Sequence, residues 1–408
     1  MLEGAFFLLI IAFNRMNTLT ANNPIAKILA LTVIVCVLQM SLSWPLWWVE
    51  NTRTYPLIPV FNFIGTIANK GINNLLLMAT FIVMGLMTWA AHKQIWIVIL
   101  LALFAILILI DINRLQAWLY QYLLIWAAGL WAYSAKTEGQ TSINQGLHRE
   151  RIALFLIQMV FIATYVWAGI NKLNVHYLTN VFNWLVGIFE WSSFLKNNYY
   201  AAVCSALVEI TVGIGLVFNR TRRGAVVLGV IMHALILILL ITDGWNKIVY
   251  PWNVGMSLGL YILFWNDEFG LTISYFKQNL TINVYAFLLF VAPILNIFGL
   301  WQYNLANTMY SGISLEVEIV ALDTGMSCLP PKFNNGKTYG VETDSSFNLD
   351  LDDWVMHEFA APYYAEEWII PVLQKKYCPC LRQYGGFIRI ETAARWSKTK
   401  RIKTIPCR

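Results

Sequence analysis

The sequence predicts an all-α polytopic membrane bundle of eight or nine transmembrane helices, followed by a small C-terminal α+β domain outside the cytoplasm. Of the 408 residues, 58% are hydrophobic and only 12% are charged, and this balance excludes a soluble globular protein. Apolar runs long enough for membrane helices recur up to residue 301 and stop there. The aromatic residues, 18 Trp, 19 Tyr and 23 Phe, suit a chain with many membrane–water interfaces.

The predicted bundle covers residues 1–301. A helix needs about 20 apolar residues to cross the hydrocarbon core, and the run at 250–265 is short, which leaves the count between eight and nine. The runs are 26–48, 74–91, 94–110, 115–134, 152–171, 199–218, 223–242, 250–265 and 283–301. Residues 51–70 and 173–198 are apolar but interrupted, so we expect interfacial or re-entrant pieces sheltered by the bundle. Residues 5–13 are too few to span, and we expect an interfacial helix there.

The distribution of basic residues predicts a cytoplasmic N-terminus and an extracytoplasmic C-terminal domain. With nine spans, more Lys and Arg fall in cytoplasmic segments than in segments on the other side, which is the expected bias. The cytoplasmic group is Arg15, Lys27, Lys93, Lys136, Arg149, Arg151, Arg220, Arg222, Arg223 and Lys277, and the other group is Arg53, Lys70, Arg114, Lys172, Lys196 and Lys247. No basic stretch is interleaved with aromatic residues, so the lipid bilayer is a predicted partner and nucleic acid is not.

Residues 302–408 are predicted to form the extracytoplasmic domain. Residues 315–322 begin with alternating apolar and acidic side chains, as a half-exposed strand does. Residues 385–391 have the pattern of another strand, and a helical run broken by prolines covers residues 354–377. A small α+β module follows from these three elements.

Four of the six cysteines fall in this C-terminal domain: Cys328, Cys378, Cys380 and Cys407. An even set of cysteines in a small extracytoplasmic module predicts disulfides, and four unpaired thiols are the alternative. The sequence does not give the connectivity. Cys378 and Cys380 do not have the spacing of a redox motif, and no nearby His set completes a zinc site, so no metal is predicted.

A few ionisable residues lie within or at the ends of the apolar runs, where burial costs several kcal/mol unless they are sheltered. They are Asp111, Arg114, Lys172, Glu209, His233 and Asp243. Asp111 and Arg114 are spaced i, i+3 in the turn between the third and fourth spans, and they could pair on one helical face. We predict that Asp111, Arg114, Gln116, Trp118 and Asn171 bind the head group of a substrate. The alternative is a hairpin clamp that orients the two spans.

Lys172 ends an apolar helix and has no acidic residue within four positions on either side. A lysine part-buried in an apolar wall loses solvation, which disfavours its charged form and makes it a usable base. The alternative is an interfacial lysine whose amine reaches water. Glu209 and His233 lie mid-span, so they must pair with each other or face an internal cavity, either to tie two spans together or to handle protons. Lys172, Glu209 and His233 are the predicted catalytic residues.

The string Ala-Gly-Ile-Asn-Lys-Leu-Asn at residues 168–174 resembles the segment that holds the active-site lysine of the vitamin K-dependent gamma-carboxylases. It also resembles the equivalent segment of the bacterial membrane proteins grouped with them as the HTTM (horizontally transferred transmembrane) domain. The features that follow in similar order are the acid-bearing span of Glu209, the turn Arg222-Arg223-Gly224, the span of His233 and the helix start Trp252-Asn253-Val254-Gly255-Met256. The resemblance covers about residues 20–300 and implies an integral protein of the bacterial inner membrane.

The resemblance also implies a membrane enzyme with Lys172 as its base. In the carboxylases the equivalent lysine is credited with deprotonating reduced vitamin K, and oxygenation then yields a strong base that removes a proton from a glutamate side chain before CO2 addition. A reduced quinone is the implied cofactor, and a lipophilic small molecule is the implied ligand. Trp118 stands where the family has a His. That difference favours the alternative, a non-catalytic membrane scaffold or assembly factor whose extracytoplasmic domain binds a protein partner that the sequence does not identify.

Overall fold

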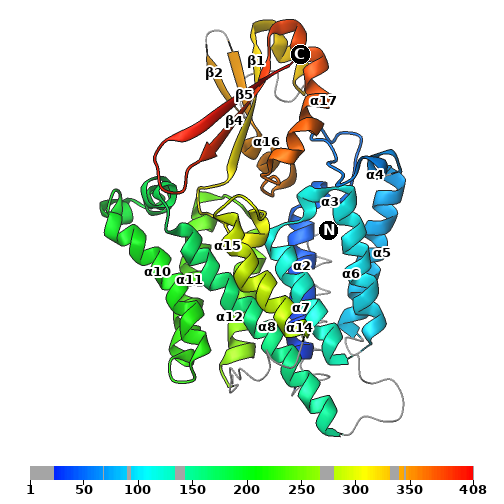
Figure 1. The fold of residues 1–408 in the computed structure, drawn as a ribbon, viewed down its shortest axis with the longest axis vertical. Coiled ribbons are helices and arrows are strands. Elements are labelled where there is room, and N and C mark those ends of the chain that lie inside the picture. The colour runs from blue at the N-terminus through cyan, green and yellow to red at the C-terminus, as the bar shows by residue number, and fades with distance from the viewer. Residues whose placement is uncertain are drawn as a thin grey trace.

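The computed structural model has a helical bundle at one end and a small β-sheet at the other (Figure 1). It describes residues 23–67, 69–89, 93–133, 143–266, 280–330, 340–343 and 346–407. The interfacial helix expected over residues 5–13 lies outside these ranges. Among the residues so described, 5 helices are long and apolar enough to cross a membrane, and two shorter apolar helices accompany them. The chain is therefore a mostly helical membrane protein.

Each apolar run of the sequence corresponds to helical structure. The longer helices are α2 (Pro24–Leu42), α5 (Lys70–Trp89), α8 (Ile143–Lys172), α10 (Tyr199–Val217) and α11 (Arg222–Asp243). The shorter ones are α6 (Gln94–Ile110), α7 (Ala117–Tyr133), α12 (Val249–Phe264) and the last segment, which joins α14 (Leu280–Ala286), the π-helical turn η4 (Phe287–Val291) and α15 (Ala292–Asn296). These helices lie side by side along the long axis of the molecule (Figure 1).

Side-chain caps mark where two of the long helices begin. The Oδ1 atom of Asn23 accepts hydrogen bonds from the backbone N–H groups of Ile25 and Ala26, at 2.9 and 3.2 Å, and Pro24 occupies the first turn of α2. Asn198 caps α10 in the same way. An amide side chain before the first turn satisfies backbone donors that have no partner within the helix.

The two interrupted stretches form short elements at the end of the bundle nearest the C-terminal domain. After α3 (Trp44–Trp47), residues 51–61 are irregular and lead into α4 (Asn62–Ile67). The second stretch holds the π-helical turn η2 (Tyr177–Val181), α9 (Phe182–Gly187) and the 3-10 helix η3 (Glu190–Leu195). The side chains of Trp191 and Phe194 are 71% and 75% exposed, as amphipathic interfacial segments leave their aromatic rings.

The C-terminal domain contains a five-stranded antiparallel sheet of order β2-β3-β1-β4-β5. Its strands are β1 (Leu315–Leu322), β2 (Gly340–Thr343), β3 (Ser346–Asp350), β4 (Phe387–Ala393) and β5 (Lys400–Pro406). As its alternating pattern predicts, β1 buries its apolar face: Val317 and Ile319 are buried opposite Ile390 and Ile388 of β4. On the other face of β1, Glu318 forms an ion pair with Arg389 at 3.2 Å.

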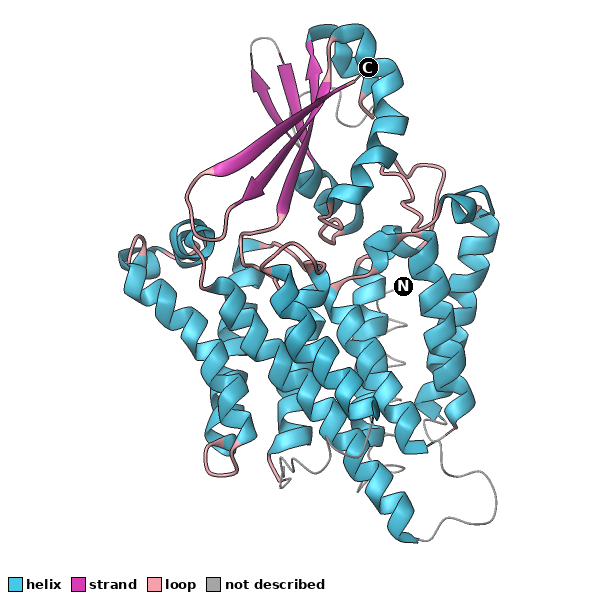
Figure 2. Cartoon of the chain, viewed as in Figure 1, coloured by secondary structure: helices cyan, strands magenta, loops and turns pink. Residues whose placement is uncertain are grey.

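Two helices complete the domain. The helical run of the sequence is divided between α16 (Leu351–Phe359) and α17 (Ile370–Leu381). Asp350 caps α16, and its side chain accepts from the backbone N–H groups of Asp352 and Asp353 at 2.7 and 3.1 Å. Helix α16 contacts both β1 and α3, so it lies between the sheet and the bundle (Figure 2).

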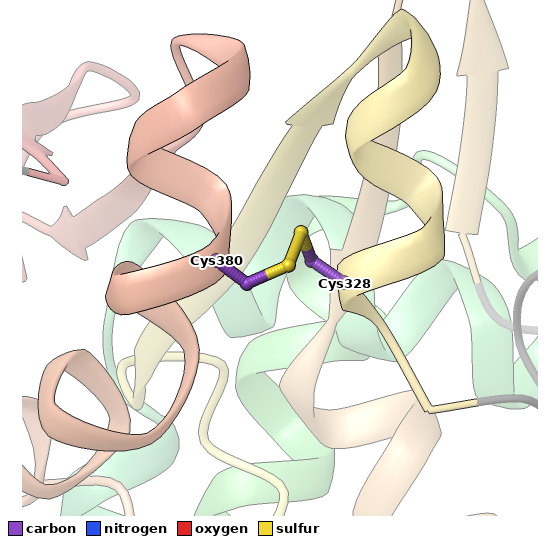
Figure 3. Close-up of a disulfide and its surroundings, with 2 residues drawn as sticks. All are labelled: Cys328 and Cys380. Atoms are coloured by element: carbon purple, nitrogen blue, oxygen red, sulfur yellow. A yellow bond between two sulfur atoms is a disulfide. The ribbon is translucent and has the colours of Figure 1, made fainter.

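The four cysteines of the domain form two disulfides. Cys328 pairs with Cys380 of α17 (Figure 3), and Cys378 of the same helix pairs with Cys407 after β5. The Cα atoms of the two pairs are 5.6 and 4.7 Å apart. The bridges close sequence separations of 52 and 29 residues, and in the chain-entropy account each contributes about 3–4 kcal/mol. Helix α17 is thereby fixed to the sheet.

Candidate functional site

Helices α8 and α10 approach closely enough to bring two distant charged residues together. A Cβ atom on Gly169 of α8 would lie 2.6 Å from the carbonyl oxygen of Ala206 in α10, so only glycine permits this approach. Gly213 of α10 packs against Val166 of α8 in the same manner. Small residues at a helix crossing let two backbones meet in a membrane protein. As a result, Lys172 at the end of α8 lies beside Glu209 in the middle of α10.

Lys172 and Glu209 form a buried ion pair. The Nζ atom of Lys172 donates to Oε1 of Glu209, and each side chain is only 9% exposed. The ammonium also lies 5.8 Å from the ring centroid of Tyr177. No acidic residue lies within four positions of Lys172 in the sequence, and the partner it finds in the fold is 37 positions away. The second oxygen of Glu209, Oε2, is buried and has no hydrogen-bond partner among the described residues.

A cavity of about 210 Å³ adjoins this ion pair. Lys172, Glu209 and His233 all line it, although they come from α8, α10 and α11. The rest of its wall is mainly apolar and includes Ala168, Phe182, Leu185, Met232, Ile236 and Leu240. Of the two arrangements expected for Glu209 and His233, they do not pair with each other, and both face a cavity. A charged pair beside a largely apolar cavity has stronger electrostatic interactions than a pair in water.

His233 is held on both sides by neutral polar groups. Its Nε2 atom lies 2.7 Å from the hydroxyl of Tyr165, and its Nδ1 atom lies 2.8 Å from Oδ1 of Asn253. The amide nitrogen of Asn253 donates to the carbonyl oxygen of Val249, so Oδ1 is the acceptor. This network places the imidazole proton on Nδ1 and leaves Nε2 to accept from Tyr165. Both ring nitrogens of His233 are therefore in use.

The turn that begins at Asp111 forms a different kind of cluster. Asp111 pairs with Arg53 and also accepts from the side chain of Asn113 at 2.7 Å and from the backbone of Ile58 at 3.4 Å. The expected pair between Asp111 and Arg114 does not form. Asp111 has extended backbone dihedrals and caps the 3-10 turn η1 (Ile112–Arg114), so the helical i, i+3 geometry does not apply to it.

Arg114 is fully buried and is satisfied by the bundle itself. Its guanidinium donates to Oδ1 of Asn73 at 2.7 Å and to the carbonyl oxygens of Leu107 and Leu46 at 2.9 and 3.3 Å. The ring of Trp47 lies 5.8 Å from its central carbon. Neither Asp111 nor Arg114 lines the cavity beside Lys172 or the one between the bundle and the C-terminal domain.

The Asp111 turn also contacts the C-terminal domain. Oδ1 of Asn113 accepts from the backbone N–H of Tyr364 at 3.2 Å, and Nε2 of Gln116 donates to the carbonyl oxygen of Pro362 at 2.9 Å. The guanidinium carbon of Arg53 lies 4.5 Å from the ring centroid of Phe359. The hairpin-clamp alternative therefore accounts for this turn, which joins two helices of the bundle and holds the domain above them.

The other three predicted substrate-binding residues divide between two environments. Asn171 donates to the carbonyl oxygen of Ala306 at 2.7 Å and accepts from Arg395 at 2.9 Å, which ties the end of α8 to the domain. Gln116 and Trp118 line a second cavity, of about 420 Å³, between the bundle and the C-terminal domain.

The sequence interpretation missed several residues that surround the charged pair. Tyr165 has no charge and lies in an unbroken apolar run, so nothing in the sequence singles it out. Asn253 stands in the Trp252–Met256 string, but its contact with His233 joins two helices and cannot be inferred from spacing. Met309 and Tyr310, which line both cavities, follow the last apolar helix.

The chain matches no family model, and neither curated proteins nor solved structures gave a significant match. Within the described residues, no group of three or more His, Cys, Asp or Glu side chains could hold a metal ion. The fold and the cavity define a helical membrane protein with a polar cluster inside its bundle. Its function has to be argued from that cluster.

Proposed function

We propose that the chain is a membrane enzyme of the vitamin K-dependent gamma-carboxylase-like type, which acts on a quinone or another lipophilic substrate in the Lys172 cavity. One observation carries this proposal. Three ionisable side chains that are far apart in the sequence line a single, largely apolar cavity inside the bundle. Buried ionisable groups are costly in a membrane protein, and their convergence on a cavity is typical of a site rather than of a lipid-facing surface.

The arrangement of the bundle suits this proposal. Nine apolar helical segments in alternating directions would put Lys172 and the C-terminal domain at one membrane face. The turn between α10 and α11, with Arg220, Arg222 and Arg223, lies at the opposite end of the bundle (Figure 1). By the positive-inside rule that end is cytoplasmic, so the domain and the cavity would be extracytoplasmic in a bacterial inner membrane.

The ion pair gives Lys172 a route to act as a base. Transfer of one proton from the ammonium of Lys172 to the carboxylate of Glu209 yields an amine and a carboxylic acid, and removes both charges from a poorly solvated site. The free amine of Lys172 can then take a proton from a substrate hydroxyl in the cavity. Glu209 holds the first proton meanwhile, and its unpartnered Oε2 is available to hydrogen-bond a ligand.

The cavity fits the head group of a quinone rather than a whole lipid. Its volume of about 210 Å³ is below the roughly 300–1,000 Å³ of pockets for drug-sized ligands. Lys172 and Glu209 would hold the polar edge of the ring, and Phe182, Leu185 and Met232 would contact its faces. A reduced quinone bound here would supply an ionisable hydroxyl and reducing equivalents.

His233 has a positioning role in this proposal. Because both of its ring nitrogens are engaged by Tyr165 and Asn253, it has no free nitrogen with which to exchange a proton with a substrate. Instead it joins α8, α11 and α12 around the cavity.

The proposal is tested with the full-length protein in lipid nanodiscs and reduced menaquinone as the probe. With dissolved dioxygen as the electron acceptor, we expect oxidation of the quinol to depend on the protein, and the Lys172→Met variant to lose about 100-fold or more of the rate, as removal of a general base does. Lys196→Met is the matched control, because Lys196 is exposed near the same end of the bundle. A quinol reaction that proceeds equally well with Lys172→Met would overturn the proposal.

A non-catalytic scaffold is the second candidate. It is favoured by the closed hydrogen bonding of His233 and by the full charge compensation of Lys172 by Glu209, which also suit a purely structural role. A wild-type protein that neither oxidises nor binds reduced menaquinone, together with stable docking of a protein partner on the C-terminal domain, would support this alternative.

A further inference from the structure

The second cavity, between the bundle and the C-terminal domain, has an aromatic wall. Trp184 and Trp245 form an edge-to-face pair with ring centroids 5.1 Å apart, and Tyr310 lies 5.7 Å from Trp245. All three residues line the cavity of about 420 Å³. The faces of such rings carry partial negative charge and attract cations.

A carboxylate without a counter-ion also lines this cavity. Asp352 lies in the first turn of α16, and no Lys or Arg forms an ion pair with it among the residues described. Two basic residues of β5 have other acidic partners, because Lys400 pairs with Glu316 and Glu391, and Lys403 pairs with Glu367. When Asp352 is ionised, the cavity therefore has an uncompensated negative charge.

Two buried polar atoms of the cavity lining lack partners in the described structure. Asn246 is 8% exposed, and its Oδ1 atom accepts no hydrogen bond, although its amide nitrogen donates to Tyr310 at 2.8 Å. Trp118 is 2% exposed, and its Nε1 atom is likewise unpartnered. Buried polar atoms are almost always hydrogen-bonded, so unpartnered ones in a cavity wall indicate a ligand that completes them. The oxygen of Asn246 lacks a hydrogen-bond donor, which an ammonium N–H would supply.

We propose that this cavity is a binding site for an organic ammonium ion, with Asp352 as counter-ion, Asn246 as hydrogen-bond acceptor and Trp184, Trp245 and Tyr310 as the aromatic wall. An anion would be repelled by Asp352, and an apolar ligand would leave both Asp352 and Asn246 unsatisfied. The proposal does not depend on catalysis at Lys172. The two cavities share Met309 and Tyr310 in their walls.

Titration of the purified full-length protein with ethanolammonium chloride at pH 8, where Asp352 is mainly ionised, tests the site through tryptophan fluorescence. We expect a saturable change that ethylene glycol, a neutral molecule of similar size, does not produce at matched ionic strength. Asp352→Asn should weaken the apparent affinity at least tenfold. Asp353→Asn is the matched control, because Asp353 is the exposed next residue and does not line the cavity, and it should leave the affinity within twofold.

Asp352→Glu keeps the charge and should retain saturable binding, which separates loss of the counter-ion from loss of the fold. An equal response to both probes, or an Asp352→Asn variant that binds like wild type, would overturn the proposal.

Two sources of the ammonium group are distinguished by the lipid. If the natural ligand is a phospholipid head group, nanodiscs of phosphatidylethanolamine will already fill the cavity and suppress the response to ethanolammonium, whereas nanodiscs of phosphatidylglycerol will not. If the ligand is a free amine, the response will be the same in both lipids. No response in either lipid contradicts an ammonium site.

Discussion

Two buried charge clusters, around Asp111 and around Lys172, differ in how their charges are compensated. Around Asp111, the carboxylate is shared by Arg53, Asn113 and the backbone of Ile58. Around Lys172, the ammonium has Glu209 as its hydrogen-bond partner, and one oxygen of Glu209 is left without any. Both oxygens of the Asp111 carboxylate therefore have partners, although Nη1 of Arg53 has none in the described structure, whereas the Glu209 carboxylate has a partner at one oxygen only.

The two clusters also differ in what surrounds them. The Asp111 turn is packed against the C-terminal domain through Asn113 and Tyr364, whereas Lys172 and Glu209 adjoin a cavity. Burial of a charge in a membrane bundle therefore does not identify a functional site. Unused hydrogen-bonding capacity next to open space is what distinguishes a candidate site from a structural clamp.

The largest expected effect comes from breaking the Asp111 cluster. Arg53→Met leaves Asp111 as an unpaired buried carboxylate, and we expect the free energy of unfolding to fall by about 3–5 kcal/mol. Thermal unfolding in detergent, followed by circular dichroism, measures this change. Arg220→Met, an exposed arginine in the α10–α11 turn, should stay within about 0.5 kcal/mol of wild type. A loss below about 1 kcal/mol for Arg53→Met would show that the cluster is not a clamp.

A double-mutant cycle sharpens the contrast between the clusters. Lys172→Met alone strands the carboxylate of Glu209 next to a cavity, and we expect a loss of about 2–3 kcal/mol. Adding Glu209→Gln should restore most of it, because Glu209 has no other hydrogen-bond partner in the described structure.

The corresponding double substitution in the other cluster, Arg53→Met with Asp111→Asn, should stay about 2–3 kcal/mol below wild type, since the Asp111 carboxylate also serves Asn113 and Ile58. Equal recovery in the two clusters would remove the distinction drawn between them.

The sequence predicted the parts of the structure that depend on local pattern. The apolar runs correspond to helices, the alternation at residues 315–322 to β1, and the clustered cysteines to two disulfides. These features follow from hydrophobic period and composition, which a single chain segment displays.

The partners of buried charges could not be predicted, because they are non-local. Lys172 meets Glu209 across a glycine-lined crossing of α8 and α10, and no short window of sequence contains both residues. Local spacing suggested a pair between Asp111 and Arg114, but Asp111 lies outside the helical turn as its cap, which directs its carboxylate to Arg53 instead. The i, i+3 rule holds only within a helix.

Replacement of His233 tests whether its hydrogen bonds to Tyr165 and Asn253 stabilise the bundle. His233→Phe leaves the hydroxyl of Tyr165 and the amide oxygen of Asn253 without their partner, and we expect a loss of about 1–3 kcal/mol in thermal unfolding. Tyr165→Phe removes only one of these contacts and should cost about 1 kcal/mol. If both variants unfold like wild type, the hydrogen-bonded chain does not hold α8, α11 and α12 together.

The smallest effect concerns Asp352, a carboxylate beside a cavity that has no counter-ion. Burial, followed by the charge of Asp350, raises the pKa of Asp352 to about 7 in the folded domain, against about 3.9 in an unfolded chain. The folded state therefore binds this proton more tightly than the unfolded state does. The resulting stabilisation is complete below about pH 4 and is lost as the pH rises through about 7.

Asp352→Asn removes this dependence, because the amide stays neutral. Relative to wild type, we expect the variant to gain nothing near pH 4 and about 1–2 kcal/mol at pH 8, since the half-buried carboxylate is partly screened. Unfolding midpoints measured across this range give the difference, with Asp353→Asn as the exposed control. Added ethanolammonium chloride should stabilise wild type but not Asp352→Asn at pH 8. A stability difference between wild type and Asp352→Asn that does not change with pH would mean that Asp352 is solvated like a surface residue.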